Sequence, residues 1–273
     1  MFYNQINEST AFIQQITATK PRIGIILGSG LGSLVDEMEV HHTISYADIP
    51  HFPQSHLVGH AGNLVFGTIG SQELVVMQGR FHAYEGFPMK EVTYPIYVMK
   101  ALGIESLIVT NACGGINPTF KPGDLMIIDD FINGVSTNPL VGPNDDRLGP
   151  RFPDMSEPYS SKLRDHARHT AHGLNIEYKE GIYTFFQGPY YETRAEIRMY
   201  GKLGSDAIGM STVPETIVAN YLGLDVLGIS VITNMATGLR TGKHSHDEVV
   251  AIANKASLDL CKWVTQMLNT WDF

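Results

Sequence analysis

Short apolar runs alternate along the chain with longer segments in which apolar side chains recur every three or four residues. The short runs are typical of buried strands and the longer period of amphipathic helices. Strands are predicted at 22–27, 63–69, 73–78, 107–110, 124–131, 177–186, 206–210 and 225–233. Helices are predicted at 5–19, 88–102 (interrupted by Pro95), 158–173, 192–203, 213–222 and 246–269. The alternation favours one α/β domain over residues 1–273, with a mixed, mostly parallel twisted central sheet flanked by helices.

Small or polar residues follow four of these strands. They occupy residues 28–33, 110–115, 209–212 and 233–238. Open α/β sheets bind their ligands at the carboxyl ends of strands. We therefore expect these four segments to meet in one pocket.

Two of the strand ends carry groups suited to phosphate. Gly28 and its neighbouring glycines let backbone N–H groups approach an anion, and Ser29 adds a hydroxyl donor. After strand 73–78, Arg80, His82 and Tyr84 would share one face of an extended segment. An arginine can grip phosphate with two hydrogen bonds, and the histidine can donate to the same anion. The pattern indicates a bound phosphate that takes part in the chemistry.

Common nucleotide-binding motifs are not satisfied. Ser33 stands where the third glycine of the dinucleotide fingerprint belongs, and no acidic partner for a ribose is evident about twenty residues further on. The Gly-Lys-Ser/Thr of a P-loop is also absent from the sequence. These departures argue against a nicotinamide-dependent dehydrogenase.

Composition narrows the partners. The chain has 28 Asp and Glu against 19 Lys and Arg, a net charge of −9, which argues against nucleic acid or an anionic membrane as partner. Apolar runs are too short to span a bilayer, and the first twenty residues do not resemble a signal peptide. Cys113 and Cys261 offer no disulfide framework. A cytoplasmic protein is expected.

Three further features need interpretation. The polar loop 134–158 is long enough to predict a functional or interfacial role. His166, His169 and His172 recur every three residues, but no zinc motif accompanies them, so a solvated helix face is favoured over a metal site. Cys113 follows a strand beside the expected phosphate loop, where its small size is the favoured explanation and a lowered thiol pKa the alternative.

Seven segments resemble, in order, the motifs of trimeric-class purine nucleoside phosphorylases. They are 28–32, 59–62, 79–86, 111–112, 188–193, 209–211 and 233–235, and the resemblance runs from about Pro21 to the final helix. It implies a single nucleoside phosphorylase domain acting in purine salvage, in a homotrimer with active sites near subunit interfaces. The implied reaction converts a purine nucleoside and phosphate into free base and α-ribose 1-phosphate. Inorganic phosphate is a co-substrate, and neither metal nor cofactor is implied.

The resemblance also implies roles for individual residues. The phosphate site would comprise Ser29, His60, Arg80, His82, the backbone of Ala112, and Ser211, with His60 closing over the anion. Tyr84 and Met210 match ribose contacts, and His246, rather than His244, matches the residue that faces the 5′-hydroxyl. Tyr191, Ile208 and Thr233 would line the base pocket, and Phe152 would cover the sugar of a neighbouring subunit. His82, Glu192 and Asn234 would be catalytic; Asn111 is interpreted as structural.

The chemistry of the base predicts a preference for 6-oxopurines. The Asn234 amide can accept from N7–H while it donates to O6, and the Glu192 carboxylate can accept from N1–H, which adenine lacks. Such polar pairing can reject a mismatched analogue by roughly 10⁴–10⁵. Inosine, guanosine and their deoxy forms are the expected substrates. Tyr191, where phenylalanine is common in the family, could also help admit xanthosine.

Alternatives remain both for the function of the protein and for the roles of individual residues. The related methylthioadenosine phosphorylases carry an acidic residue at the position of Asn234 and an apolar one at that of His246, and a non-catalytic nucleoside-binding protein is a further possibility. Individually, Glu192 and Ser211 could cap the helices that follow them, Asn234 could form a turn, and Tyr84 could pack in the core.

Overall fold

The secondary structure is that of a computed structural model, which describes residues 2–55, 61–240 and 245–272 except the side chain of His246. The strands are β1 (Ile23–Ile26), β2 (Glu39–Ser45), β3 (Asn63–Ile69), β4 (Gln72–Gln78), β5 (Ser106–Gly115), β6 (Leu125–Asn133), β7 (Tyr178–Phe185), β8 (Ala207–Gly209) and β9 (Asp225–Met235). The α-helices are α1 (Phe2–Ile16), α2 (Met89–Val92), α3 (Tyr94–Leu102), α4 (Ser161–Leu174), α5 (Arg194–Lys202), α6 (Val213–Tyr221) and α7 (His246–Asn269). Three short 3-10 helices span Gly32–Glu37, Tyr46–Asp48 and Ala83–Glu85.

All these strands belong to one mixed sheet in the order β2-β3-β4-β1-β5-β8-β7-β6-β9. β5 also pairs with β9 over ten residue pairs, so β5, β8, β7, β6 and β9 form a closed ring. Pairing is antiparallel at β2–β3, β3–β4, β5–β8 and β6–β9, and parallel at the other junctions. The expected mixed, mostly parallel sheet is confirmed; the ring was not predicted.

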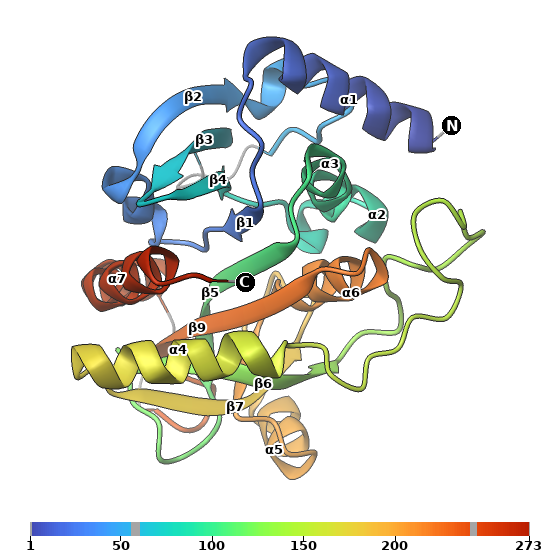
Figure 1. Ribbon diagram of the computed structural model, residues 1–273. Helices are drawn as coiled ribbons and strands as arrows, with labels where there is room; N and C mark the ends of the chain where they lie inside the picture. The colour runs from blue at the N-terminus through green and yellow to red at the C-terminus, as the bar shows by residue number, and fades with distance from the viewer. Residues whose placement is uncertain (1, 56–60, 241–244, 273) are drawn as a thin grey trace.

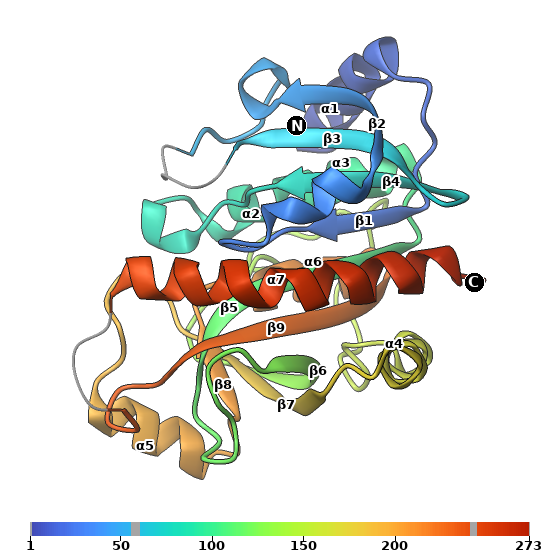
Figure 2. The same ribbon diagram turned by 90° about the vertical axis from the view of Figure 1, so that its left-hand side faces the viewer.

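Helices cover both faces of the sheet. α7 and α4 lie against one face, and α1, α3 and α6 against the other (Figures 1 and 2). Alternation along β1 divides its side chains accordingly, because Ile23 and Ile25 join the α7 cluster around Trp263 while Ile26 joins the α1–α3 cluster. Alternating apolar runs thus become a sheet buried on both sides. No described helix is both long and apolar enough to cross a membrane.

Three sequence predictions need correction. β2 was missed because five of its seven residues are exposed and it is an edge strand without an apolar face. The predicted helix 88–102 is two helices, with Pro95 in the first turn of α3, where its missing N–H costs no helical bond. Segments 110–115 and 233–235 continue β5 and β9 instead of forming turns, since the two strands pair along their whole length.

Candidate active site

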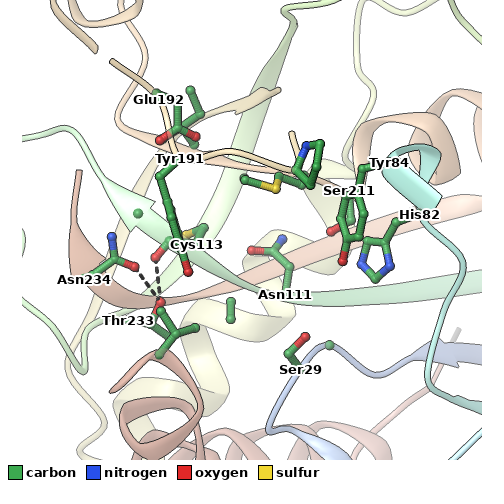
Figure 3. Close-up of a pocket in the computed structure, with 18 of the residues that line it drawn as sticks. Ser29, His82, Tyr84, Asn111, Cys113, Tyr191, Glu192, Ser211, Thr233 and Asn234 are labelled. Atoms are coloured by element: carbon green, nitrogen blue, oxygen red, sulfur yellow. Dashed lines mark hydrogen bonds between the residues drawn. The ribbon is translucent and has the colours of Figure 1, made fainter. Parts of the chain in front are cut away.

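The four predicted segments do meet in one pocket. It is lined from β1, β4, β5, β7, β8, β9 and the segments that follow them, and Val249 of α7 closes one side. The lining residues are Gly28, Ser29, Arg80, His82, Tyr84, Asn111, Ala112, Cys113, Gly114, Pro189, Tyr191, Glu192, Ile208, Gly209, Met210, Ser211, Thr233, Asn234 and Val249. In Figure 3, Ser29 and His82 appear at one end of this pocket and Glu192 and Asn234 at the other.

Gly28 lets the end of β1 approach β5 closely. A Cβ at this position would lie 2.7 Å from the Cα of Asn111, so only glycine fits. The Gly28 N–H donates to Thr110 Oγ1 over 3.1 Å, and that hydroxyl donates to the Ile26 carbonyl over 2.9 Å. The glycine therefore brings Ser29 beside the strand that carries Asn111 and Ala112.

Arg80 is buried in the wall of the pocket. Its Nη1 donates to Glu215 Oε1 over 3.1 Å and to Thr212 Oγ1 over 3.3 Å, and its Nη2 donates to the Thr110 carbonyl. These contacts come from β5 and α6, far from Arg80 in the sequence. The guanidinium is thus fixed in the wall of the pocket.

The prediction that Arg80, His82 and Tyr84 alternate along an extended segment is wrong for Tyr84. Residues Ala83–Glu85 form a 3-10 helix, and this turn stacks the Tyr84 ring on His82 with centroids 4.6 Å apart. All three residues nevertheless line the pocket, and Tyr84 is only half-buried, which contradicts the core alternative. Burial raises the pKa of Tyr84 to about 12, so its hydroxyl keeps its proton as a hydrogen-bond donor.

Glu85 contacts both the ring and the backbone of His82. His82 Nδ1 lies 3.3 Å from Glu85 Oε1, the backbone N–H of His82 donates to the same oxygen over 2.9 Å, and Ser55 donates to Oε2 over 2.5 Å. Burial alone would raise the pKa of Glu85, but these hydrogen bonds outweigh it and lower the pKa. The Glu85 carboxylate therefore orients the His82 ring through Nδ1, and a histidine ring held in this way can donate a hydrogen bond to an anion through its other nitrogen.

Glu192 and Asn234 lie at the opposite end, together with Tyr191 (Figure 3). Burial raises the pKa of the Glu192 carboxyl to about 7. Asn234 is oriented by its neighbours, because its Oδ1 accepts from Thr233 Oγ1 over 3.1 Å and its Nδ2 donates to the Met235 carbonyl over 3.3 Å. Thr233 Oγ1 also lies 3.1 Å from the Cys113 carbonyl of β5. A carboxyl and an amide therefore face one cavity.

The capping and turn alternatives are contradicted. Thr193 is the N-cap of α5 and forms a capping box with Glu196, so Glu192 stays in the pocket wall. Thr212, not Ser211, is the residue before α6. Asn234 lies within β9 instead of in a turn.

Cys113 does not carry an activated thiol. Burial raises its pKa to about 12, with the nearby Glu192 carboxyl adding to the shift, which contradicts the alternative of a lowered pKa. Its Sγ donates weakly to the Val231 carbonyl at 3.6 Å. Cys113 acts as a small packing residue between β5 and β9.

One predicted site residue, Phe152, does not lie in the pocket of this chain. Phe152 is 86% exposed on the loop between β6 and α4, which projects from the body in Figure 1, and it does not line the cavity. That loop is anchored by Tyr221 of α6, whose hydroxyl donates to Asn144 and to the Asp145 carbonyl. His60 and the His246 side chain lie outside the described residues, although residue 246 begins α7.

Asn111, Gly114, Pro189 and Val249 also line the pocket, although none of them was assigned a site role from the sequence. Asn111 is buried on β5, and its Nδ2 donates to Thr212 Oγ1 over 3.0 Å. Its place directly before Ala112 in a predicted ligand segment was a usable signal. Val249 offered none, because an apolar residue in an amphipathic helix usually faces the core.

The helix α4 histidines do not cluster. His169 and His172 are exposed, as the solvated-face interpretation predicts, whereas His166 lies against the Met267 carbonyl and the Trp271 ring. Within residues 2–55, 61–240 and 245–272, no three His, Cys, Asp or Glu side chains are grouped to hold a metal ion.

Comparisons with known proteins agree with this geometry. The sequence model described as "Phosphorylase superfamily" matches residues 22–269. Purine nucleoside phosphorylase 1 of Geobacillus stearothermophilus is 54% identical over 95% of this chain and 94% of its own length. The purine nucleoside phosphorylase of Bos taurus is 45% identical over 97% of this chain and 94% of its own.

Solved structures agree as well. Two crystal structures each match with a TM-score of 0.94: the Schistosoma mansoni purine nucleoside phosphorylase in complex with adenosine, and a Schistosoma purine nucleoside phosphorylase in complex with hypoxanthine. They are 40% and 39% identical, and each comparison covers 99% of this chain and 98% of theirs. The chain therefore belongs to the phosphorylase superfamily, among its purine nucleoside phosphorylases, which cleave purine nucleosides with phosphate.

Proposed function

We propose that the pocket is the active site for phosphorolysis of 6-oxopurine nucleosides, with phosphate at the Arg80–His82 end and the base at the Glu192–Asn234 end. The observation that supports this most directly is the pocket itself, in which a buried cationic end and a carboxyl–amide end face one cavity. Ser29, Ser211 and the backbone of Ala112 would complete the phosphate site. Tyr84 and Met210 would contact the ribose between the two ends.

Charge development explains why these groups are needed. Cleavage of the glycosidic bond leaves positive charge on the ribose and negative charge on the purine. A phosphate held by Arg80 and His82 beneath C1′ stabilises the ribosyl cation and then captures it. An amide at Asn234 that accepts from N7–H and donates to O6 stabilises the departing base. The reaction needs no group beyond these side chains, and neither a metal nor an organic cofactor is part of the proposal.

Base selection follows from the same pair. Hypoxanthine and guanine offer N1–H to the Glu192 carboxylate and O6 to the Asn234 amide, whereas adenine offers a lone pair at N1 and a donor at C6. The Schistosoma mansoni enzyme has been crystallised with adenosine, and a Schistosoma purine nucleoside phosphorylase with hypoxanthine. Our proposal concerns the rate of turnover and not binding. Each mismatched polar pair lowers that rate because it weakens the binding of the transition state.

The proposal is tested by assaying three nucleosides side by side in the presence of phosphate: inosine, adenosine and methylthioadenosine. Inosine is expected to exceed adenosine by roughly 10²-fold or more in kcat/KM, since two polar pairs are mismatched. Turnover of adenosine within tenfold of inosine contradicts the 6-oxopurine assignment. Preference for methylthioadenosine favours the related phosphorylase instead.

The Glu192 carboxyl predicts a pH-dependent selectivity. Above pH 7 it is mainly a carboxylate that accepts from N1–H; as the pH falls through about 7 it gains a proton and can donate to N1 of adenine instead. The ratio of kcat/KM for inosine to that for adenosine should therefore fall as pH decreases from 8 to 6. Taking the ratio cancels the titration of any group that affects both substrates.

The matched control for this pH profile is Glu192→Gln, whose amide does not titrate. Its inosine-to-adenosine ratio should be flat over the same range. A wild-type ratio that does not change between pH 8 and 6, or an unchanged slope in the variant, contradicts the role of Glu192.

We also propose that the enzyme is a cytoplasmic homotrimer in which Phe152 covers the sugar in a neighbouring subunit. The support is an aromatic side chain presented to solvent on an anchored loop, together with the exposed Val141 on the same loop. Exposed aromatic residues of this kind are enriched at interfaces.

Phe152→Ala should raise the KM for inosine by roughly fivefold, the effect of about 1 kcal/mol from one aromatic contact. The KM for phosphate should change little, because the aromatic ring would touch only the sugar. Leu258→Ala removes another exposed apolar side chain, from α7, and serves as the control. Light scattering establishes the assembly of each variant. An unchanged inosine KM in a trimeric variant contradicts the shared site.

A further inference from the structure

A buried carboxylate stands directly behind the cationic end of the pocket. Glu215 of α6 and Arg80 after β4 are separated by 135 positions in the sequence, and their side chains are 3% and 2% exposed. We infer that Glu215 is a positioning residue, which orients the Arg80 guanidinium for phosphate without touching the substrate. This inference rests on the proposed phosphate-binding role of Arg80.

The contact is specific to one edge of the guanidinium. Glu215 Oε1 accepts from Nη1 over 3.1 Å, and the Thr110 carbonyl accepts from Nη2. Acceptors on two elements therefore fix the plane of the group. Because a guanidinium is rigid, fixing its plane also fixes the direction in which its remaining edge can donate.

Stability alone does not account for this pair. Burying two charges costs desolvation energy that their attraction repays only with full hydrogen bonding, and apolar replacements are often more stable. Glu215 falls short of full bonding, since its Oε2 is buried without a hydrogen-bond partner among the described residues. What the pair does provide is a buried arginine that remains compensated when the pocket holds no anion.

The position of Glu215 in its helix also supports a positioning role. It is the third residue of α6, where a glutamate commonly turns back to bond the N-cap residue in a capping box. The cap residue Thr212 has no side-chain capping bond here, and the Glu215 carboxylate is directed to Arg80 instead. Glu215 therefore bonds Arg80, which is distant in the sequence, in place of the N-cap residue of its own helix.

Thr212 extends the same network to the pocket wall. Its backbone has φ 79° and ψ −50°, a γ-turn closed by the Val213 N–H to the Ser211 carbonyl over 2.9 Å, which is strained for a β-branched residue. This turn holds its Oγ1 within 3.3 Å of Arg80 Nη1 and 3.0 Å of Asn111 Nδ2. Ser211 Oγ lies 3.2 Å from the same hydroxyl. Glu215 and Thr212 thus form one layer behind Arg80, Ser211 and Asn111, which line the pocket.

Two substitutions of Glu215 separate the effect of its side-chain length from the effect of its charge. Glu215→Gln keeps the length of the side chain and an acceptor for Nη1 but removes the charge, whereas Glu215→Asp keeps the charge and withdraws the acceptor by one methylene group. If Glu215 positions Arg80, Glu215→Asp should raise the KM for phosphate at least tenfold above that of Glu215→Gln, about the effect of one charge-assisted hydrogen bond. The KM for inosine should differ between the two variants by less than about threefold, because a positioning role at Arg80 affects the anion first.

Steady-state kinetics of the full-length protein, with phosphate and inosine each varied, measure both constants, and thermal unfolding is recorded for each variant. The control is Glu180→Asp. It shortens the carboxylate that forms an ion pair with Arg168 of α4. The inference is overturned if Glu215→Gln raises the phosphate KM more than Glu215→Asp, or if both constants rise together in Glu215→Asp. Wild-type protein that cleaves inosine without phosphate would instead refute the proposed function.

Discussion

Asn234→Asp is expected to lower kcat/KM for inosine by roughly 10²–10³-fold, the cost of removing one preorganised donor from a desolvated reaction centre. The carboxylate cannot donate to O6, and its negative charge opposes the charge that develops on the departing purine. A 6-amino group can donate to that carboxylate, so adenosine should lose less. The inosine-to-adenosine ratio of kcat/KM, measured with saturating phosphate, should therefore fall.

Asn133→Asp makes the same change of amide to carboxylate outside the pocket, where the amide donates to the Thr137 carbonyl. It should leave both rates close to those of the wild type. An Asn234→Asp enzyme with the wild-type substrate ratio would remove Asn234 from the base site.

Arg80→Ala should raise the KM for phosphate by roughly ten- to 150-fold, since a hydrogen bond to a charged group contributes about 1.5–3 kcal/mol. The KM for inosine should change far less. The substitution also leaves Glu215 as an unpaired buried carboxylate, which costs stability of about 3–5 kcal/mol. A lower midpoint of thermal unfolding should therefore accompany the kinetic effect.

Two comparisons separate these effects. Arg80→Lys retains a cation near Glu215 but loses the planar guanidinium, so it should be more stable than Arg80→Ala while its phosphate KM remains raised. Arg168→Ala removes an arginine from an ion pair on α4, away from the pocket. Equal increases in both KM values for Arg80→Lys would count against a role of Arg80 at phosphate.

The elements with a buried apolar pattern could be predicted from the sequence. β1, β3, β4, β7 and α7 lie close to their expected positions, because burial on one or both faces imposes a readable period. β2 has exposed polar residues and pairs at the sheet edge, so its strand character comes from pairing with β3. The ring through β5 and β9 depends on pairings between distant segments, which local periodicity does not encode.

Some residues of the candidate site could also be predicted from the sequence, and others could not. Ser29 and Asn234 lie in strand-end segments that could be found, because an α/β sheet delivers such segments to one edge, whereas Glu192 was found through the resemblance of segment 188–193. The surroundings of Arg80 could not be predicted: Glu215 and Thr212 approach it only after α6 has packed beside β5. The raised pKa of Glu192 likewise arises from burial, which is a property of the assembled pocket.

The most direct measurement is hypoxanthine release from inosine in phosphate-free buffer and in the same buffer with added phosphate, with the sugar product identified in each case. Release should depend on phosphate, saturate as phosphate is raised, and yield ribose 1-phosphate in equal amount to hypoxanthine. Release at the same rate without phosphate, or free ribose as the product, would contradict the account.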